Sequence, residues 1–441
     1  MKRRKLFLGS LSLLLAALCA VNLVRAGTEK PRPSPSVPMP AQQASIGIAS
    51  ARQPITLELM AILEQQPELK ALLQKSLVLA KEKNPDPKTN PAQSLEEYFD
   101  FLDRSVQAMP WEGLEKAEAA SLFHQIDQSL NYFYFLLDQP MPELSSRGYW
   151  NPSLQYVEEL RPWILRYVQA WGAFLSSPQS WSGEYLEMVR REERFGLDKD
   201  WYESPDHWRS WNDFFTRRLR SPQARPIAGP RDDVLLCSPA DSVPQGLWAI
   251  DANSAIVPQV LLKSKEFQSA PQLLGEGSAY RHAFAGGSLT HTFLDVHDYH
   301  RFHFPLSGTI REVRLIPAQA AAGGVVLWNA ERKLYELLTQ EPGWQSVETR
   351  ASVILETPSF GLVALLPIGM SQVASVVLEA SVEAGAQVQK GDPLGCFYFG
   401  GSDFVMLFQK GVKLELSVPK ENGGYAHVLM GEPYGRLTKG P

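Results

Sequence analysis

A histidine-rich segment near residue 300 carries the densest set of groups for proton transfer. The stretch HTFLDVHDYHRFHFPLSG, residues 291–308, combines four histidines with two aspartates and an arginine. Imidazole exchanges protons near neutral pH, so the segment suits acid–base catalysis. Histidine is also a common metal ligand, but no cysteine or second acidic cluster completes a site, and we expect no metal. Solvated structural histidines are the remaining alternative. The polar members are His291, Asp295, His297, Asp298, His300, Arg301 and His303.

Two further segments offer an acid and a nucleophile. In CSPADSVPQG, residues 237–246, Asp241 follows a short apolar run, where a carboxylate can orient an imidazole; an aspartate in a turn is the alternative. In YFGGSDFVMLF, residues 398–408, Ser402 follows two glycines between apolar runs, and a tight turn is the alternative. Together they supply Asp, His and Ser in chain order. The glycine that follows the serine in a nucleophile elbow is missing.

The elements that must position these groups change character near residue 205. Before it the pattern is helical: Ser94 to Glu97 form a capping box, and residues 115–140 and 153–175 have helical periodicity. From about residue 234, short β-rich runs alternate with Gly, Pro and polar turns. The sequence predicts an α+β protein, with a helical N-terminal domain over residues 51–205 and a predominantly β domain over residues 206–441.

The N-terminus predicts export. MKRRK is followed by an apolar stretch over residues 6–24 and a small-residue cleavage signal ending at Ala26. We expect residues 1–26 to be a signal peptide, or alternatively an uncleaved membrane anchor, and residues 27–50 to be a Pro/Ser-rich linker. The bulk of the chain is then periplasmic or secreted, or held at the membrane. Cys237 and Cys396 are expected to be buried free thiols, with a disulfide as the alternative. The net charge of −5 argues against nucleic acid as a partner.

Several segments together resemble the phosphatidylserine decarboxylase family. They are SWNDFFTRRLRSPQARPI (210–227), SPAD (238–241), DYHRFHFPLSG (298–308) and KGDPLGCFYFGGSD (390–403), in the family's order. The resemblance covers the chain from Ser210 to the C-terminus. The helical half, with SPADSVPQGLW, FAGGSLTHTFL and LLPIGMSQVASV, resembles a branch with an N-terminal extension. That branch includes decarboxylases of free aromatic amino acids such as L-tryptophan.

The resemblance implies a self-cleaving proenzyme. The cut would fall between Gly401 and Ser402, leaving a β chain that ends at Gly401 and an α chain whose first residue, Ser402, becomes a pyruvoyl cofactor. His303 would act as the general base for cleavage, with Asp241 orienting its imidazole. His300 would support decarboxylation and protonation of the product. Neither a metal nor pyridoxal phosphate is required.

The implied reaction is decarboxylation of phosphatidylserine to phosphatidylethanolamine, and the alternative substrate is a free, aromatic L-amino acid. Three departures from the family pattern bear on this choice: Ser242 replaces a common Gly, Asp403 replaces a common Thr or Ser, and the export signal is unusual for phospholipid synthesis. Other classes are an exported binding protein on an inactive scaffold and a metal-dependent hydrolase. The intact catalytic residues argue against the scaffold. Membrane association and homo-oligomer formation are left open.

Overall fold

A computed structural model describes residues 52–114, 121–145, 152–257, 269–318, 325–338, 344–370, 375–421 and 423–440. Contacts divide the chain into two units, Arg52–Val418 with His427–Pro441, and Met1–Ala51 with Pro419–Ala426. In the second of these, the described part is a hairpin of β16 (Lys420–Glu421) and β17 (Gly424–Tyr425). The predicted signal peptide and linker lie outside the described residues.

The helical region predicted from the sequence is present. Helix α4 starts at the predicted capping box, where Ser94 Oγ accepts a hydrogen bond from Glu97 N at 3.2 Å, and Glu97 accepts one from Gln93 N at 2.7 Å. Helix α6 begins at Arg161, later than expected, because residues 154–156 form a separate 3-10 turn, η2. The helices are α2 (Pro54–Gln65), α3 (Pro67–Lys83), α4 (Leu95–Ser105), α5 (Leu122–Leu137), α6 (Arg161–Leu175), α7 (Gly183–Arg191), α8 (Trp211–Phe215) and α9 (Ala270–Leu274).

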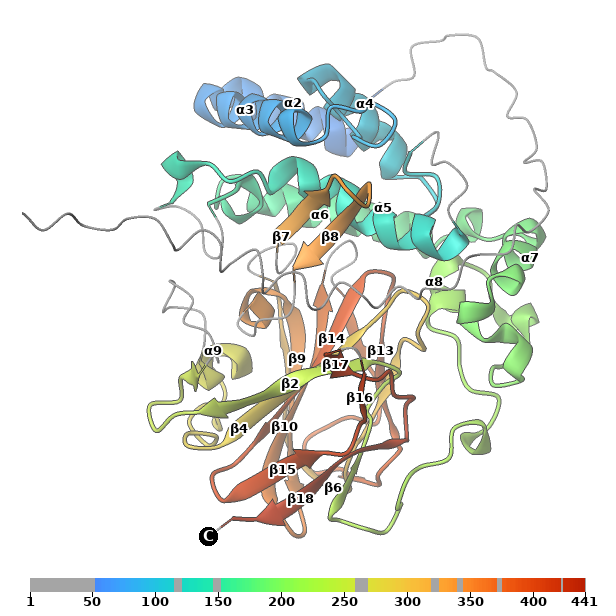
Figure 1. The fold of residues 1–441 in the computed structure, drawn as a ribbon, viewed down its shortest axis with the longest axis vertical. Helices are drawn as coiled ribbons and strands as arrows, with labels where there is room; N and C mark the ends of the chain where they lie inside the picture. Colours follow the sequence, from blue (N-terminus) through green and yellow to red (C-terminus); the bar gives the residue numbers. More distant parts are fainter. Residues whose placement is uncertain are drawn as a thin grey trace, which may run out of the picture. The chain divides into compact units, whose positions relative to one another are not determined.

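Aromatic side chains pack together in the core of the helical region. Phe133 of α5 stacks on Tyr167 of α6 with ring centroids 4.4 Å apart, and Trp163 lies 5.7 Å from the same tyrosine. This core extends into the β region. Helix α5 packs against the hairpin of β7 (Val325–Asn329) and β8 (Leu334–Leu338), which lies beside it in Figure 1. Both regions belong to one unit, and a domain boundary near residue 205 stays a prediction.

The β region is built on one antiparallel sheet of eight strands, in the order β12-β6-β9-β10-β14-β4-β2-β3 (Figure 1). Each apolar run that predicted a strand supplies one, within the described residues. The strands are β2 (Val243–Ile250), β3 (Ile256–Val257), β4 (Ser288–Leu294), β6 (Gly308–Ile316), β9 (Thr349–Thr357), β10 (Gly361–Met370), β12 (Gln387–Val388) and β14 (Gly401–Phe408).

Two three-stranded sheets complete the region. One has the order β11-β13-β5, from β11 (Val376–Leu378), β13 (Pro393–Phe397) and β5 (Arg301–His303). The other has the order β1-β18-β15, from β1 (Leu235–Cys237), β18 (Pro433–Lys439) and β15 (Val412–Leu416). Strands β5 and β13 thus bring the histidine segment beside the chain that leads to Gly401.

Strand β14 is buried along its whole length. It pairs with β10 on one side and β4 on the other, and Ser402 faces Gly369 and Leu294 in these two neighbours. Position 369 must be glycine, because a Cβ there would lie 2.8 Å from the backbone oxygen of Ser375. Gly401 and Ser402 therefore open a central strand, directly after a bend at residues 399–400, and the alternative of a simple turn does not describe them.

Two smaller expectations can be assessed here. Cys237 and Cys396 are both free and buried, which confirms the expectation of unpaired thiols. Among the described helices, none combines the length and the hydropathy needed to span a bilayer.

The buried lysine of the KGDPLG segment should stabilise the β region. Lys390 Nζ donates to three backbone carbonyls, those of Gly229, Asp232 and Leu235, at 2.6–2.7 Å. Lys390→Met would leave these carbonyls without a partner, and we expect a loss of about 2 kcal/mol of unfolding free energy. Thermal denaturation followed by circular dichroism measures this. Lys413→Met, which removes an exposed ion pair with Glu415, is the control and should change little. Equal melting temperatures for both variants would contradict the assignment.

Candidate active site

Ser402 lies at the start of β14 with its hydroxyl buried and uncommitted. The residue is 0 % exposed, and among the described residues its Oγ has no hydrogen-bond partner. A buried hydroxyl without a partner costs about 1–3 kcal/mol, so its retention needs an explanation other than stability. A nucleophile provides one, because a hydroxyl without a fixed hydrogen bond is free to attack a neighbouring carbonyl.

The face of β14 that carries Ser402 looks toward the histidine segment. Phe404, two residues on and therefore on the same face, packs on Phe302 of β5 with centroids 5.8 Å apart. The chain before Ser402 also contacts the histidine segment, because Phe397 N donates to the carbonyl oxygen of His300 at 2.9 Å. The fold therefore brings the segments that contain Ser402 and His300–His303 together.

His300 is a neutral imidazole with one free nitrogen. Its Nδ1 lies 3.0 Å from the carbonyl oxygen of Asp298, which assigns the ring proton to Nδ1. Among the described residues, Nε2 has no partner, and the side chain is fully buried. Its ring stacks on Phe215 of α8 at 3.8 Å. Burial, and then the charge of Arg217, hold the pKa of His300 well below its usual value. The free Nε2 can accept a proton.

Arg217 fixes the backbone of this loop. The arginine is fully buried, and its Nη2 donates to the carbonyls of His297 and Asp298, each at 3.1 Å. Its guanidinium also lies over the ring of Tyr202 at 4.5 Å. Since Asp298 O in turn accepts a hydrogen bond from His300 Nδ1, Arg217 helps to position the His300 imidazole. Arg217 belongs to the FTRRL segment of the sequence, but that segment alone did not indicate this role.

His303 is also neutral, but both of its nitrogens are occupied. Nδ1 donates to Gly391 O at 2.8 Å, and Nε2 accepts from the Tyr299 hydroxyl at 3.2 Å. Burial lowers the pKa of His303 to about 4. Gly391 has φ +91°, and a Cβ there would lie 2.5 Å from Ile227, so only glycine fits where this carbonyl is needed.

Asp241 is buried and pairs with the guanidinium of Arg225. Its carboxylate is not hydrogen-bonded to the imidazole of His303. Its Oδ2 accepts from Arg225 at 2.9 Å and its Oδ1 from Met430 N at 2.7 Å. The hydrogen bonds of His303 go to other groups, although its backbone N donates to Pro239 O, two residues before Asp241, at 2.8 Å. Asp241 and His303 are thus neighbours without a direct bond between their side chains, and the orienting role of Asp241 stays a prediction.

Asp403, the departure from the family pattern, has a defined environment. Its carboxylate contacts His291 Nδ1 at 3.0 Å and accepts from Gln345 Nε2 at 2.9 Å, and both Asp403 and His291 are 0 % exposed. Successive residues of a strand point to opposite faces, so this pair lies on the other side of the sheet from the Ser402 hydroxyl. Asp403 therefore anchors the start of β14 without occupying the serine's side.

A second group of histidines lies around the carboxylate of Asp298. His427 Nε2 contacts Asp298 Oδ1 at 2.8 Å, and His297 Nε2 lies 3.5 Å from the same oxygen. These three side chains are close enough together to hold a metal ion. Although burial lowers it, the hydrogen bond to Asp298 raises the pKa of His427 to about 9. Sequence reasoning missed His427, which is 129 residues from its partner.

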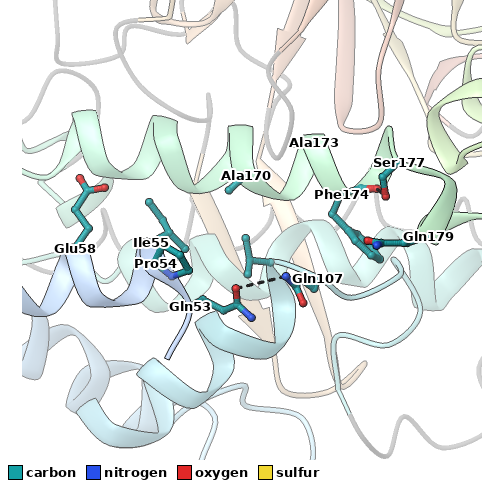
Figure 2. A pocket seen from close by; sticks show the side chains of 11 residues that line it. Gln53, Pro54, Ile55, Glu58, Gln107, Ala170, Ala173, Phe174, Ser177 and Gln179 are labelled. Atoms are coloured by element: carbon teal, nitrogen blue, oxygen red, sulfur yellow. Dashed lines mark hydrogen bonds between the residues drawn. The ribbon is translucent and has the colours of Figure 1, made fainter. Parts of the chain in front are cut away.

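The cavity drawn in Figure 2 is separate from this site. It has a volume of about 490 Å³ and lies among α2, the end of α4 and α6. Gln107 donates to Gln53 across it at 3.4 Å (Figure 2). Its lining includes Ile55, Ala170 and Phe174 and none of the predicted catalytic residues.

Comparison with known proteins defines the class. The family model for phosphatidylserine decarboxylase matches residues 211–436. The chain is 31% identical over 272 residues to the phosphatidylserine decarboxylase proenzyme of Chlamydia caviae, covering 59% of this chain and 81% of that protein. The chain belongs to the phosphatidylserine decarboxylase family, whose members are carboxy-lyases.

Two other relatives differ in the share of their own length that aligns with this chain. Phosphatidylserine decarboxylase proenzyme 2 of Oryza sativa subsp. japonica is 33% identical over 241 residues, which are 54% of this chain and only 35% of that protein. Decarboxylase iboD of Amanita muscaria is 28% identical over 299 residues, which are 62% of this chain and 83% of that protein.

The buried, neutral His303 makes stability depend on pH. Its pKa is about 4 in the folded chain and about 6.5 in an unfolded one. Between these values the unfolded chain binds a proton that the folded chain excludes, so stability is full above pH 6.5 and falls as the pH drops toward 4. We expect His303→Asn to reduce the pH dependence of the free energy of unfolding by the contribution of one bound proton. Melting temperatures measured at a series of pH values test this. His282→Asn, at an exposed histidine, is the control; identical slopes for wild type and His303→Asn would refute the prediction.

Proposed function

We propose that this protein is a self-processing, pyruvoyl-dependent decarboxylase. The observation that carries the proposal is the pair of uncommitted polar atoms, Ser402 Oγ and His300 Nε2, in a buried site at the start of β14. One atom suits the attack on the preceding carbonyl, and the other suits proton exchange with a substrate.

Cleavage needs only groups of this chain and water. Ser402 Oγ loses its proton to a base and bonds to the carbonyl carbon of Gly401, and the peptide C–N bond breaks to give an ester. Removal of the Cα proton of Ser402 then breaks the Cβ–O bond, which releases the Gly401 carboxylate. Water replaces the nitrogen of the remaining enamine, and ammonia leaves. The burial of Ser402 suits the residue that becomes the pyruvoyl group, since the site is sheltered from bulk water.

His303 is the proposed base for cleavage. Its neutral state at physiological pH is required for that role, and Tyr299 is the group that would have to release its Nε2 first. Asp241, held by Arg225, would stabilise the protonated ring from nearby.

The mature site would decarboxylate an α-amino acid group. The pyruvoyl group supplies a carbonyl that accepts electrons as CO2 leaves. His300 would hold the proton that returns to the substrate carbon, with Arg217 and Phe215 keeping its ring in place. Phe399, in contact with Phe215 at 5.2 Å, would exclude water beside it.

Two substrates fit this chemistry. Phosphatidylserine is favoured by the names of the relatives from Chlamydia caviae and Oryza sativa. A free aromatic amino acid is favoured by the helical region, whose Trp171 and Trp211 pack on Phe399 at 5.7 and 5.8 Å, three residues before Ser402. We further propose that the N-terminal segment exports the enzyme, so that the reaction takes place outside the cytoplasm.

Two histidine variants separate maturation from turnover. His303→Ala should leave the chain uncut, because the base for cleavage is lost. His300→Ala should be cut at Gly401–Ser402 but turn over at least about 100-fold more slowly. Mass spectrometry of the denatured protein reports the cut, and CO2 release reports turnover. A fully active His300→Ala enzyme would exclude the proposed role of His300, and a cut His303→Ala chain would exclude that of His303. His282→Ala is the matched control. This variant should be cut like wild type and should turn over substrate at the wild-type rate.

A further inference from the structure

The group of histidines around Asp298 converges on one carboxylate oxygen. Asp298 Oδ1 lies 2.8 Å from His427 Nε2 and 3.5 Å from His297 Nε2. The ligand atoms that the three side chains offer all lie within 4.8 Å of one another. In a tetrahedral zinc site with bonds of about 2.0–2.1 Å, ligand atoms are about 3.3 Å apart. A small rotation of the two rings would therefore bring all three atoms to bonding distance of one ion.

An ion pair with Asp298 uses only one of the two imidazoles. One protonated ring is enough to pair with one carboxylate, and two protonated rings at the same oxygen repel each other. A divalent cation between the three side chains would use both ring nitrogens and the carboxylate oxygen together. The convergence of His297 and His427 on the same oxygen is therefore more typical of a metal site than of a simple ion pair.

The backbone that carries two of these side chains is already fixed. Asp298 N donates to Asp295 O at 2.9 Å, and Asp298 Oδ2 accepts from Asp295 N at 2.8 Å, so residues 295–298 form a closed turn. Arg217 also donates to the carbonyls of His297 and Asp298. Because Oδ2 is occupied in this way, Oδ1 is the oxygen of Asp298 that is directed at the histidines.

The third side chain comes from a distant part of the chain. Val428, the neighbour of His427, exchanges two backbone hydrogen bonds of 2.9 Å with Ser242, which fixes this segment. The side chains of His297 and His427 are 23% and 36% exposed, so an ion and a water molecule can enter from solvent. The sequence-based expectation of no metal rested on the lack of a further ligand near the histidine segment, and His427 supplies one from 129 residues away.

A second carboxylate lies behind one of the imidazoles. Asp295 Oδ2 is 3.8 Å from His297 Nδ1, and among the described residues this nitrogen has no hydrogen-bond partner. A metal-bound imidazole almost always directs its other ring nitrogen to a carboxylate, a carbonyl oxygen or water, which fixes the ring and raises its basicity. Asp295 is placed to orient the ring of His297 in this way.

We propose that His297, Asp298 and His427 bind a zinc ion, with water as its fourth ligand. Two imidazoles and one carboxylate suit zinc, whereas calcium and magnesium favour oxygen ligands. The inference goes beyond the proposed function, because the proposed decarboxylation does not use this ion. The site is a structural one that ties the turn at residues 295–298 to the segment around His427.

The site would gain a further role in a cut protein. His297 and Asp298 precede Gly401, and His427 follows Ser402, so cleavage between Gly401 and Ser402 would leave the ligands on two chains. The zinc ion would then bridge the two chains. This consequence rests on the proposed function, whereas the site itself does not.

Zinc binding is tested on the untagged full chain after its metal has been removed with a chelator. Competition with a chromogenic chelator should show one zinc ion bound per protein, and zinc should raise the melting temperature. His297→Gln and His427→Gln should each weaken zinc binding at least about 100-fold, because glutamine can still donate to Asp298 but is a poor zinc ligand. Asp295→Asn should weaken it about tenfold.

The control is His207→Gln, since His207 and Glu203 form an exposed pair, 3.4 Å apart, outside the proposed site. This variant should bind zinc like wild type. Without metal, the two ligand variants should melt close to metal-free wild type, which excludes misfolding, and either one that folds is sufficient for the test. A wild-type protein that binds no zinc overturns the inference, as does unchanged binding in a ligand variant. An uncut chain that binds one zinc ion supports the site and contradicts only the proposed function.

Discussion

The site depends on a serine hydroxyl that is buried inside a β-sheet. Among the described residues, this hydroxyl has no hydrogen-bond partner. Ser402 lies at the start of a strand that is buried throughout and is paired on both sides, so the backbone at the proposed cleavage bond is held firmly in place. Leaving a buried hydroxyl without a partner costs about 1–3 kcal/mol, and the surrounding sheet offsets that cost. The same constraint explains why Asp403 is turned to the other face and held by His291.

The site is shared between the helical and β regions. Asn212 of α8 accepts from Phe399 N at 2.9 Å, and aromatic rings from α6 and α8 pack on the same phenylalanine. The helices therefore set the position of the chain just before the proposed cleavage bond.

The fold class could be predicted from the sequence, because capping residues and alternating strands are local signals, whereas the roles of Asp241, His303 and Ser402 were implied only by the family resemblance. Ser94 starts its helix as expected, and each predicted apolar run in the described β region forms a strand. Pairings between distant residues could not be predicted. The contact of Asp241 with Arg225 and that of Asp298 with His427 follow from how strands and loops meet, which no short pattern encodes.

The central claim, that Ser402 is released as a modified N-terminus, is tested most directly by the intact mass of the purified wild-type protein under denaturing conditions. The account predicts two chains that part between Gly401 and Ser402, with the second chain blocked by a pyruvoyl group at its first residue. A single chain with an unmodified Ser402, after incubation under mild conditions, would contradict it.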